Sequence, residues 1–379
     1  MQTRFIQSIN DIDAADWNSL CGTDYPFLRH GFFTALENSG STHRDNGWQP
    51  YHLLLENNDK LVGTMPLFFK MHSYGEFVFD WAWAEAYQRS GLNYYPKLLN
   101  AIPFTPATGP RWVLSSEINQ AEALKKMHHS IADLADKMNL SSGHILFPTD
   151  RAAEQLAELG WLQRIGCQFH WRNQGYRDFA DFLDGFASRK RKTVKKERAK
   201  VYDQGITLTV KEGAKITAED WRQFYDFYQI TYLKHSGKLG YLTKAAFFML
   251  ASNMGKYLIL IQAQKDNDII ASALYFRSND TLYGRYWGCR QEFACLHFEV
   301  CYYRGIEYAI EKGLQHFDPG AQGEHKIQRG FQPTLTYSSH WIVNNQFRDA
   351  ISTFLLNEQK EVEMYLQQAN KLLPFKREN

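Results

Sequence analysis

The feature that most constrains the fold is an internal repeat. Residues 31–40 (G-F-F-T-A-L-E-N-S-G) resemble residues 246–255 (A-F-F-M-L-A-S-N-M-G), and each stretch predicts a helix that ends at a glycine. Residues 51–69 likewise resemble residues 257–276. In both of these stretches two apolar runs flank a turn rich in Asn and Asp, which is the pattern of a β-hairpin.

Two further matches follow in the same order along the chain. Residues 94–102 (Y-Y-P-K-L-L-N-A-I) share the pattern Y-Y-x-x-[LI]-x-x-A-I with residues 302–310, and this spacing predicts one face of a helix. Residues 103–111 (P-F-T-P-A-T-G-P-R) then correspond to residues 316–323 (H-F-D-P-G-A-Q-G). Because the four matches are collinear, the sequence indicates a duplication.

Each half is therefore expected to run helix, hairpin, strand, helix, strand and loop. The third strand is expected at residues 76–80 in the first half and at residues 281–288 in the second. These elements predict an α/β or α+β fold, with a mixed β-sheet flanked by helices in each of two domains. We expect the domains to span residues 1–172 and 173–379, with a closing helix at residues 348–372.

Composition sets limits on the class of protein. A chain of 379 residues is long enough for two domains, each with a core. The net charge is only +2, so a polyanion would have to bind to a local patch. The five scattered cysteines are typical of reduced thiols, and the sequence shows neither a signal peptide nor an apolar run of membrane-spanning length. A soluble, cytoplasmic protein is the expectation.

Four stretches carry a resemblance to a known family. They are H-G-F-F-T-A-L-E-N-S-G-S (30–41), Y-G-E-F-V-F-D-W-A-W-A-E-A-Y (74–87), S-R-K-R-K-T-V-K-K-E-R (188–198) and P-G-A-Q-G-E-H-K-I-Q-R-G-F (319–331). Together they resemble the bacterial FemAB-like family of peptidoglycan biosynthesis/recognition proteins. The order of elements is similar to that of GNAT acyltransferases. The resemblance implies two tandem GNAT-like domains and the transfer of an acyl or aminoacyl group to an amine acceptor, such as a cell-wall precursor.

The strongest candidate site lies within residues 317–333. After F-D-P-G-A-Q-G the second half adds E-H-K-I-Q-R, whereas the first half goes from F-T-P-A-T-G directly to P-R-W-V-L. A polar cluster in one copy of a duplicated frame indicates a site and not a scaffold requirement. Glu324 or His325 would act as general base, and Lys326 and Arg329 would bind a phosphate or carboxylate. The alternative is an exposed loop with ordinary salt bridges.

A second candidate is the stretch D-W-A-W-A, in which Asp80 follows the predicted strand. Indole walls such as Trp81 would desolvate the carboxylate and raise its pKa, which would make Asp80 an alternative base. Otherwise Asp80 caps the next helix and the tryptophans are core residues. Lys70 and His72 are expected to line the same opening.

A third candidate is the stretch Y-G-R-Y-W-G-C-R. Strict alternation along a strand would place Tyr283, Arg285 and Trp287 on one face, as a substrate platform anchored by Arg285. The alternative is that the two rings are core residues and that Arg285 pairs with an acid.

A basic run is the fourth candidate. Eight basic residues lie between Arg189 and Lys200, with Glu197 as the single acid. Such a helix is either a solvated face or a surface for phosphates of a tRNA backbone, a coenzyme pyrophosphate or a lipid. The predicted phosphate-binding residues are Arg189, Lys190, Lys192, Lys195 and Lys196.

The nature of the donor depends on a missing motif. CoA-dependent GNAT enzymes usually carry Q/R-x-x-G-x-G/A after the central strand, where backbone N–H groups bind the pyrophosphate. Here the second half reads W-G-C-R-Q-E-F-A-C-L, which favours aminoacyl-tRNA over acyl-CoA as donor. No tightly bound cofactor and no metal is expected, because Cys295-x-His297-x-Glu299 lacks a second ligand pair. The competing functions are a CoA-dependent N-acyltransferase and a non-catalytic protein that binds anionic or cell-wall ligands.

Overall fold

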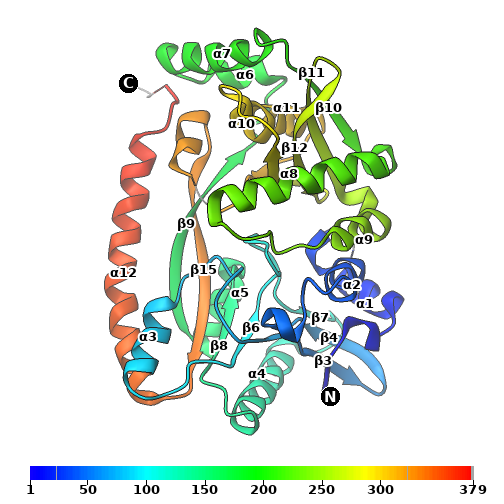
Figure 1. The fold of residues 1–379 in the computed structure, drawn as a ribbon. Helices are drawn as coiled ribbons and strands as arrows, with labels where there is room; N and C mark the ends of the chain where they lie inside the picture. The colour runs from blue at the N-terminus through cyan, green and yellow to red at the C-terminus, as the bar shows by residue number, and fades with distance from the viewer. Residues whose placement is uncertain (23, 322, 377–379) are drawn as a thin grey trace. The chain divides into compact units, whose positions relative to one another are not determined.

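The chain forms two compact units of mixed α/β structure (Figure 1). The structure is a computed structural model and describes residues 1–22, 24–321 and 323–376. Unit 1 comprises Met1–Gly166 and Leu335–Met364, and unit 2 comprises Cys167–Thr334 and Tyr365–Asn379. The expected α/β class is confirmed. Among the helices described, none combines the length and apolarity needed to cross a membrane.

Unit 1 begins with a small antiparallel sheet of order β1-β3-β4-β7. Its strands are β1 (Gln2–Ile6), β3 (His52–Asn57), β4 (Lys60–Met65) and β7 (Val113–Leu114). Helices α1 (Ala14–Cys21) and α2 (His30–Asn38) lie between β1 and β3 in the sequence. The predicted β3–β4 hairpin turns at Asn58 and Asp59, both with positive φ, which Asn and Asp tolerate better than most residues.

The second sheet of unit 1 contains a parallel strand pair. Its strands are β2 (Trp48–Pro50), β5 (Phe68–Lys70), β6 (Lys97–Asn100), β8 (Ser142–Leu146) and the end of β15 (Gln332–Ile342). Strands β6 and β8 are parallel, and the other neighbours are antiparallel. The helices of this part are α3 (Trp81–Arg89), α4 (Gln120–Lys137) and α5 (Asp150–Glu158).

Unit 2 is built on one sheet that also contains a parallel pair. Its strands, in sheet order, are β10 (Thr207–Glu212), β11 (Leu258–Lys265), β12 (Asp268–Arg277), β13 (Thr281–Cys289), β14 (His316–Asp318) and the end of β9 (Leu162–Arg172). Only β13 and β14 are parallel. Its helices are α6 (Phe179–Asp184), α7 (Ser188–Tyr202), α8 (Ala218–Ser236), α9 (Lys244–Met254), α10 (Leu296–Phe298), the π-helical turn η6 (Glu299–Tyr303), α11 (Arg304–Glu311) and the 3₁₀ helix η7 (Glu324–Arg329).

The duplicated architecture is confirmed. The order β1-α1-α2-β3-β4 in unit 1 recurs as β10-α8-α9-β11-β12 in unit 2, with the same antiparallel pairing. Each unit then has a parallel strand pair joined by a helix, β6-α4-β8 in unit 1 and β13-α11-β14 in unit 2.

Two details of the predicted repeat are wrong. Residues 76–80 form bends and no strand, since Gly75 and Phe77 have positive φ. Residues 94–102 contain the strand β6 in place of the predicted helix. All four residues of β6 (K-L-L-N) are buried, and four buried residues are too few to show a periodicity that separates strand from helix.

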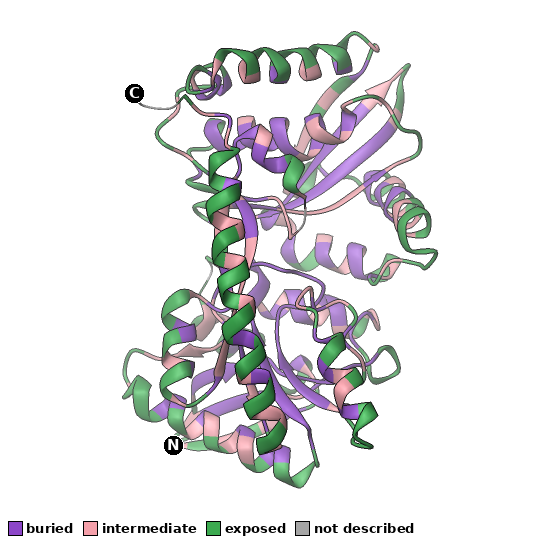
Figure 2. Cartoon of the chain, turned by 90° about the vertical axis from the view of Figure 1, so that its left-hand side faces the viewer, coloured by how far each residue is buried: buried purple, intermediate pink, exposed green. Residues whose placement is uncertain are grey.

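The units also differ from the predicted domains, 1–172 and 173–379, because each takes an outer strand from the other half of the sequence. Residues 338–342 of β15 pair with β8 in unit 1, and Trp171 and Arg172 of β9 pair with β14 in unit 2. The closing helix is observed as α12 (Asn345–Lys371). Figure 2 shows that much of its surface is exposed.

Candidate functional site

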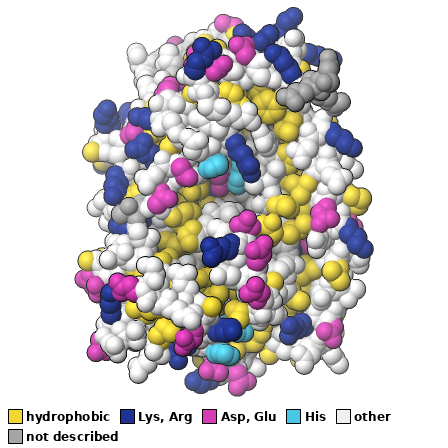
Figure 3. All heavy atoms as spheres, turned by 180° about the vertical axis from the view of Figure 1, so that it is seen from behind, with side chains coloured by type: hydrophobic (Ala, Val, Ile, Leu, Met, Phe, Trp, Pro, Cys, Tyr) yellow, Lys and Arg dark blue, Asp and Glu magenta, His cyan; other side chains and the backbone are white. Residues whose placement is uncertain are grey.

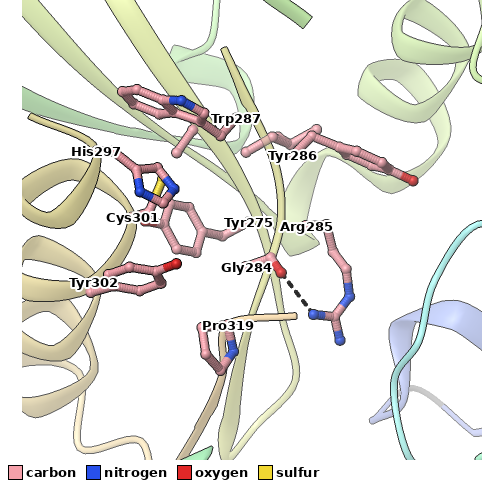
Figure 4. Close-up of a pocket in the computed structure, with 11 residues that line it drawn as sticks. Tyr275, Gly284, Arg285, Tyr286, Trp287, His297, Cys301, Tyr302 and Pro319 are labelled. Carbon is pink, nitrogen blue, oxygen red and sulfur yellow. Dashed lines mark hydrogen bonds between the residues drawn. The ribbon is translucent and has the colours of Figure 1, made fainter. Parts of the chain in front are cut away.

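The sheet of unit 2 opens between β13 and β14. Residues 281–283 pair with residues 316–318, but β13 continues to Cys289 after β14 has ended at Asp318. A cavity of about 170 Å³ occupies this opening (Figure 4). Its walls include Trp287 of β13, His297 of α10 and Tyr302 of η6. The parallel strands β13 and β14 thus separate at the end of β14, where the chain enters the predicted site at residues 317–333.

A β-bulge in β13 shapes the floor of the cavity. Tyr275 pairs with Gly284 and Leu274 pairs with Tyr286, so Arg285 is the extra residue of the bulge. Such a bulge bends the strand and removes backbone groups from the regular ladder.

The bulge overturns the predicted platform of three side chains on one face. On β12, Phe276 pairs with Tyr283 and Ala273 pairs with Trp287. Phe276 and Ala273 are three residues apart and so point to opposite faces of the sheet. Their partners Tyr283 and Trp287 therefore also point to opposite faces. Trp287 therefore faces the cavity, where its ring centroid is 5.3 Å from that of His297 (Figure 4). The predicted alternation of side chains between the two faces of β13 is interrupted at Arg285, the extra residue of the bulge.

Arg285 pairs with an acid, as the alternative interpretation predicted. Its side chain is buried, and Nη2 lies 2.7 Å from Oδ2 of Asp318 while Nη1 lies 3.3 Å from Oδ1. Burial alone would raise the pKa of Asp318, but the charge of Arg285 holds it below its ordinary value. This ion pair fixes the end of β14 against the bulge.

Two uncharged histidines lie at the cavity. Nε2 of His325 is 2.9 Å from the Tyr302 hydroxyl, and its ring is 6.1 Å from that of His297. Burial, followed by the cations Lys326 and Arg329, lowers the pKa of His325 to about 4. Burial also lowers the pKa of His297 to about 4. Burial raises the pKa of Tyr302, so its hydroxyl keeps its proton and can donate it to His325.

The predicted anion-binding residues of η7 make internal contacts. Nζ of Lys326 is buried and donates to the carbonyl of Gly320 at 2.7 Å, and burial lowers its pKa to about 8. Arg329 donates to the His325 carbonyl at 2.6 Å and to Glu197 at 2.9 Å. Both cations therefore stabilise the loop itself.

Glu324 points away from this arrangement. It is exposed, and its Oε1 accepts a hydrogen bond from the Tyr365 hydroxyl at 2.8 Å. Of the three residues predicted as bases, only His325 contacts a residue that lines the cavity.

Asp80 lies in unit 1, in a buried ionic network. Its Oδ2 accepts hydrogen bonds from the Tyr94 hydroxyl at 2.6 Å and from Lys97 Nζ at 2.5 Å. Burial would raise the pKa of Asp80, but the charge of Lys97 holds it well below its ordinary range. The expected upward shift beside tryptophan is therefore wrong. The side chain of Asp80 makes no helix-capping hydrogen bond either, and the nearby Trp81 is exposed.

Lys70 belongs to the same network, and His72 does not. Nζ of Lys70 lies 3.8 Å from the centre of the Trp48 ring and 3.8 Å from Glu76. Burial lowers the pKa of Lys70 to about 7 and raises that of Glu76 to about 7. His72 instead bonds to the carbonyl of Asn46 at 3.0 Å.

Sequence reasoning missed several polar residues of both units. In unit 1 they are Glu76, Tyr94, Lys97, His144 and His340, and in unit 2 they are His170, His297, Tyr302 and Asp318. A signal was present for Lys97, because it is a charged residue directly before the apolar pair Leu98 and Leu99. The other side chains come together only through the tertiary fold.

The basic helix α7 has an inner and an outer face. On the inner face Val194 is buried, Glu197 pairs with Arg329, and Arg198 pairs with Glu299 at 2.8 Å. Figure 3 shows basic side chains at the top of the rear view, where α7 lies. The exposed cations of α7 for which the described residues offer no ion-pair partner are Arg189, Lys192, Lys195, Lys196 and Lys200.

The family model for FemAB-like proteins, described as peptidoglycan biosynthesis/recognition, matches residues 8–377. This chain belongs to the FemAB-like family. A search of curated protein sequences gave no match. The match spans both units, and it confirms the resemblance that the four sequence stretches indicated.

Solved structures share the fold of this FemAB-like chain. FemX has 14% identity and a TM-score of 0.54, covering 93% of this chain and 100% of FemX. The C-terminal domain of a putative lysylphosphatidylglycerol synthetase from Agrobacterium fabrum has 9% identity and a TM-score of 0.55, covering 93% and 97%. A conserved protein of unknown function from Bacteroides thetaiotaomicron has 12% identity and a TM-score of 0.52, covering 90% and 100%. At these identities the likeness concerns the fold.

The two units of this FemAB-like chain differ at the parallel strand pair, which is β6 and β8 in unit 1 and β13 and β14 in unit 2. In unit 1, residues 101–111 follow β6 and are largely buried. Arg111 donates to the carbonyl of Leu146 at 2.5 Å, and Asn100 donates to the carbonyls of Pro66 and Arg111 at 2.6 and 2.8 Å. Asn100 and Arg111 thus tie this segment to the carbonyl groups around the ends of β6 and β8.

Proposed function

We propose that this chain is an acyl or aminoacyl transferase that acts on an amine acceptor, and that the opening between β13 and β14 in unit 2 holds the reacting groups. The observation that carries the proposal is the Tyr302–His325 hydrogen bond beside a cavity at the separated strands. Membership in the FemAB-like family supports the same reaction class.

The chemistry is the transfer of an activated carbonyl group. The amine nitrogen attacks the carbonyl carbon of an ester or thioester, a C–N bond forms, and the C–O or C–S bond breaks as the leaving group takes up a proton. Once the C–N bond forms the nitrogen becomes acidic, so the uncharged His325 can accept its proton through the Tyr302 hydroxyl. Positioning supplies much of the remaining rate enhancement, because the donor is already activated.

A cation near the cavity assists the negatively charged intermediate. Nζ of Lys326 lies 6.0 Å from the centre of the Tyr302 ring and is buried. In a poorly solvated place a positive charge interacts strongly with an oxyanion. Lys326 is thus assigned an electrostatic role and not direct binding of a phosphate.

For the donor, aminoacyl-tRNA is favoured and acyl-CoA is the alternative. The segment between β13 and α10, residues 290–295, contains no glycine that would let backbone N–H groups enclose a pyrophosphate. The exposed cations of α7 would attract the phosphates of either donor. An amine-bearing cell-wall precursor is the proposed acceptor, because the family description concerns peptidoglycan. Both donors occur in the cytoplasm, where we place the reaction.

Donor binding tests this assignment. The purified full-length chain is titrated with charged tRNA, uncharged tRNA and acetyl-CoA in parallel, and the variant Lys192→Glu/Lys196→Glu serves as control. We expect charged tRNA to bind most tightly and the variant to lose this binding. Tight binding of acetyl-CoA alone would select the CoA-dependent alternative. If none of the three binds, the transferase proposal is wrong and a non-catalytic binding role takes its place.

A further inference from the structure

A second cavity of about 200 Å³ lies in unit 2, between α7, η6 and η7. Its lining residues differ from those of the cavity between β13 and β14. Its polar lining residues are Lys190, Thr193, Glu197, Tyr303, Gln328 and Arg329. We propose that this cavity is a binding site for a single phosphate group, as carried by a phosphomonoester or by the end of a nucleotide.

The first argument is an unused donor on a buried guanidinium. Arg329 is 6% exposed. Its Nη1 donates to the His325 carbonyl and its Nη2 to Glu197, but Nε meets no acceptor among the described residues. Burying such a donor without a partner is costly. Phosphate oxygens are among the strongest acceptors for a guanidinium.

The second argument is another cation that lines the cavity, Lys190 of α7. Nζ of Lys190 donates a hydrogen bond to Oε1 of Gln328. Nε2 of Gln328 donates a second hydrogen bond to the carbonyl of Leu372 at 2.9 Å. The side-chain amide of Gln328 is therefore held by both neighbours. An ammonium group has three donors, so Lys190 keeps donors for a bound anion. The hydroxyl of Thr193 donates its proton within α7, to the carbonyl of Arg189.

The third argument concerns charge. The lining holds two cations, Lys190 and Arg329, and one carboxylate, Glu197. Both oxygens of Glu197 accept from Arg329 Nη2 at 2.9 Å, and the Tyr303 hydroxyl donates to one of them. The carboxylate is thus engaged with its own partners. The exposed lysines of α7 add a positive field around the mouth of the site.

Calorimetric titration of the full-length chain with inorganic phosphate tests the proposal without any transfer assay, so its failure is distinct from failure of the proposed transferase. Lys190→Gln should weaken binding about tenfold, which corresponds to about 1.4 kcal/mol. The matched control is Lys200→Gln, since Lys200 is an exposed cation on the same helix that does not line the cavity. This control should change affinity less than about twofold. Equal thermal midpoints would show that both variants fold.

A change in the opposite direction guards against loss by misfolding. Glu197→Gln removes the one negative charge of the lining and should tighten phosphate binding several-fold. Adenosine 3′,5′-bisphosphate and glycerol 3-phosphate then distinguish a nucleotide source from a lipid headgroup source. The proposal is overturned if phosphate shows no saturable binding, if Lys190→Gln and Lys200→Gln weaken it equally, or if Glu197→Gln leaves the affinity unchanged.

Discussion

His325 and Lys326 are neighbours in the sequence but lie in different environments. His325 lies partly at the surface and its ring bonds to the Tyr302 hydroxyl, whereas Lys326 is buried and bonds to Gly320. The sequence grouped them correctly as part of one candidate site. It could not separate a base from a buried cation, because that distinction depends on burial, which the turn-rich stretch does not encode.

The pH dependence of transfer follows from these two residues. Burial lowers the pKa of His325 to about 4, so above that pH the ring is neutral and can accept a proton. When the pH falls through this value, the ring becomes protonated and can no longer act as a base. Burial lowers the pKa of Lys326 to about 8, so its positive charge is lost as the pH rises through that value. We expect the transfer rate to be highest between about pH 5 and pH 7 and to fall on both sides, as a rate–pH profile would show. A rate that rises steadily above pH 8 would contradict the role of Lys326.

The buried ionic network of unit 1 contributes to stability. Nζ of Lys97 bonds to Glu76 at 2.8 Å and to Asp80 at 2.5 Å, and all three side chains are almost fully buried. Lys97→Met would leave the buried Asp80 without its ion-pair partner and Glu76 with only the more distant Lys70, so we expect a loss of about 3–5 kcal/mol in the free energy of unfolding. Urea denaturation measures this loss. Lys60→Met breaks only the exposed pair with Glu117 and should cost less than about 1 kcal/mol. Similar losses in both variants would argue against the network.

At the scale of elements, patterns local in sequence were predictable and irregular features were not. The hairpin β3–β4, the helix α7 and the closing helix α12 follow from turn residues and periodicity. The bulge at Arg285 does not, because one extra residue leaves no mark in an alternating run. The strand β6 was mistaken for a helix for a related reason, since four buried residues are too few to show a period.

Close packing of α8 on β13 gives a prediction at this scale. A Cβ on Gly288 would lie 2.2 Å from the carbonyl carbon of Phe227, so Gly288→Ala must push α8 away from the strand. We expect a loss of about 1–3 kcal/mol in the free energy of unfolding, measured by thermal denaturation. Gly255→Ala is the matched control, because a Cβ there meets no atom within 4 Å. If the two variants are equally stable, the helix is not packed against this glycine.

At the scale of the whole chain, the duplication was visible in the sequence and the exchange of outer strands was not. Matching stretches show which elements recur, but they do not show which strand completes which sheet. The pairing of residues 338–342 with β8, and of Trp171 with β14, depends on long-range hydrogen bonds that no local pattern specifies. The sequence shows that the two copies have diverged only where one copy has additional residues, such as E-H-K-I-Q-R in the second half.

The most direct test of the central claim compares two adjacent residues in single-turnover transfer from charged tRNA to cell-wall precursor peptides with a free amine. His325→Ala should lower the rate about 10²-fold or more, because it removes the proton acceptor of Tyr302. Glu324→Ala, one residue earlier, removes an exposed side chain that accepts a hydrogen bond from Tyr365, and this variant should stay near the wild-type rate. Full activity in His325→Ala, or loss of activity in Glu324→Ala instead, would contradict the account.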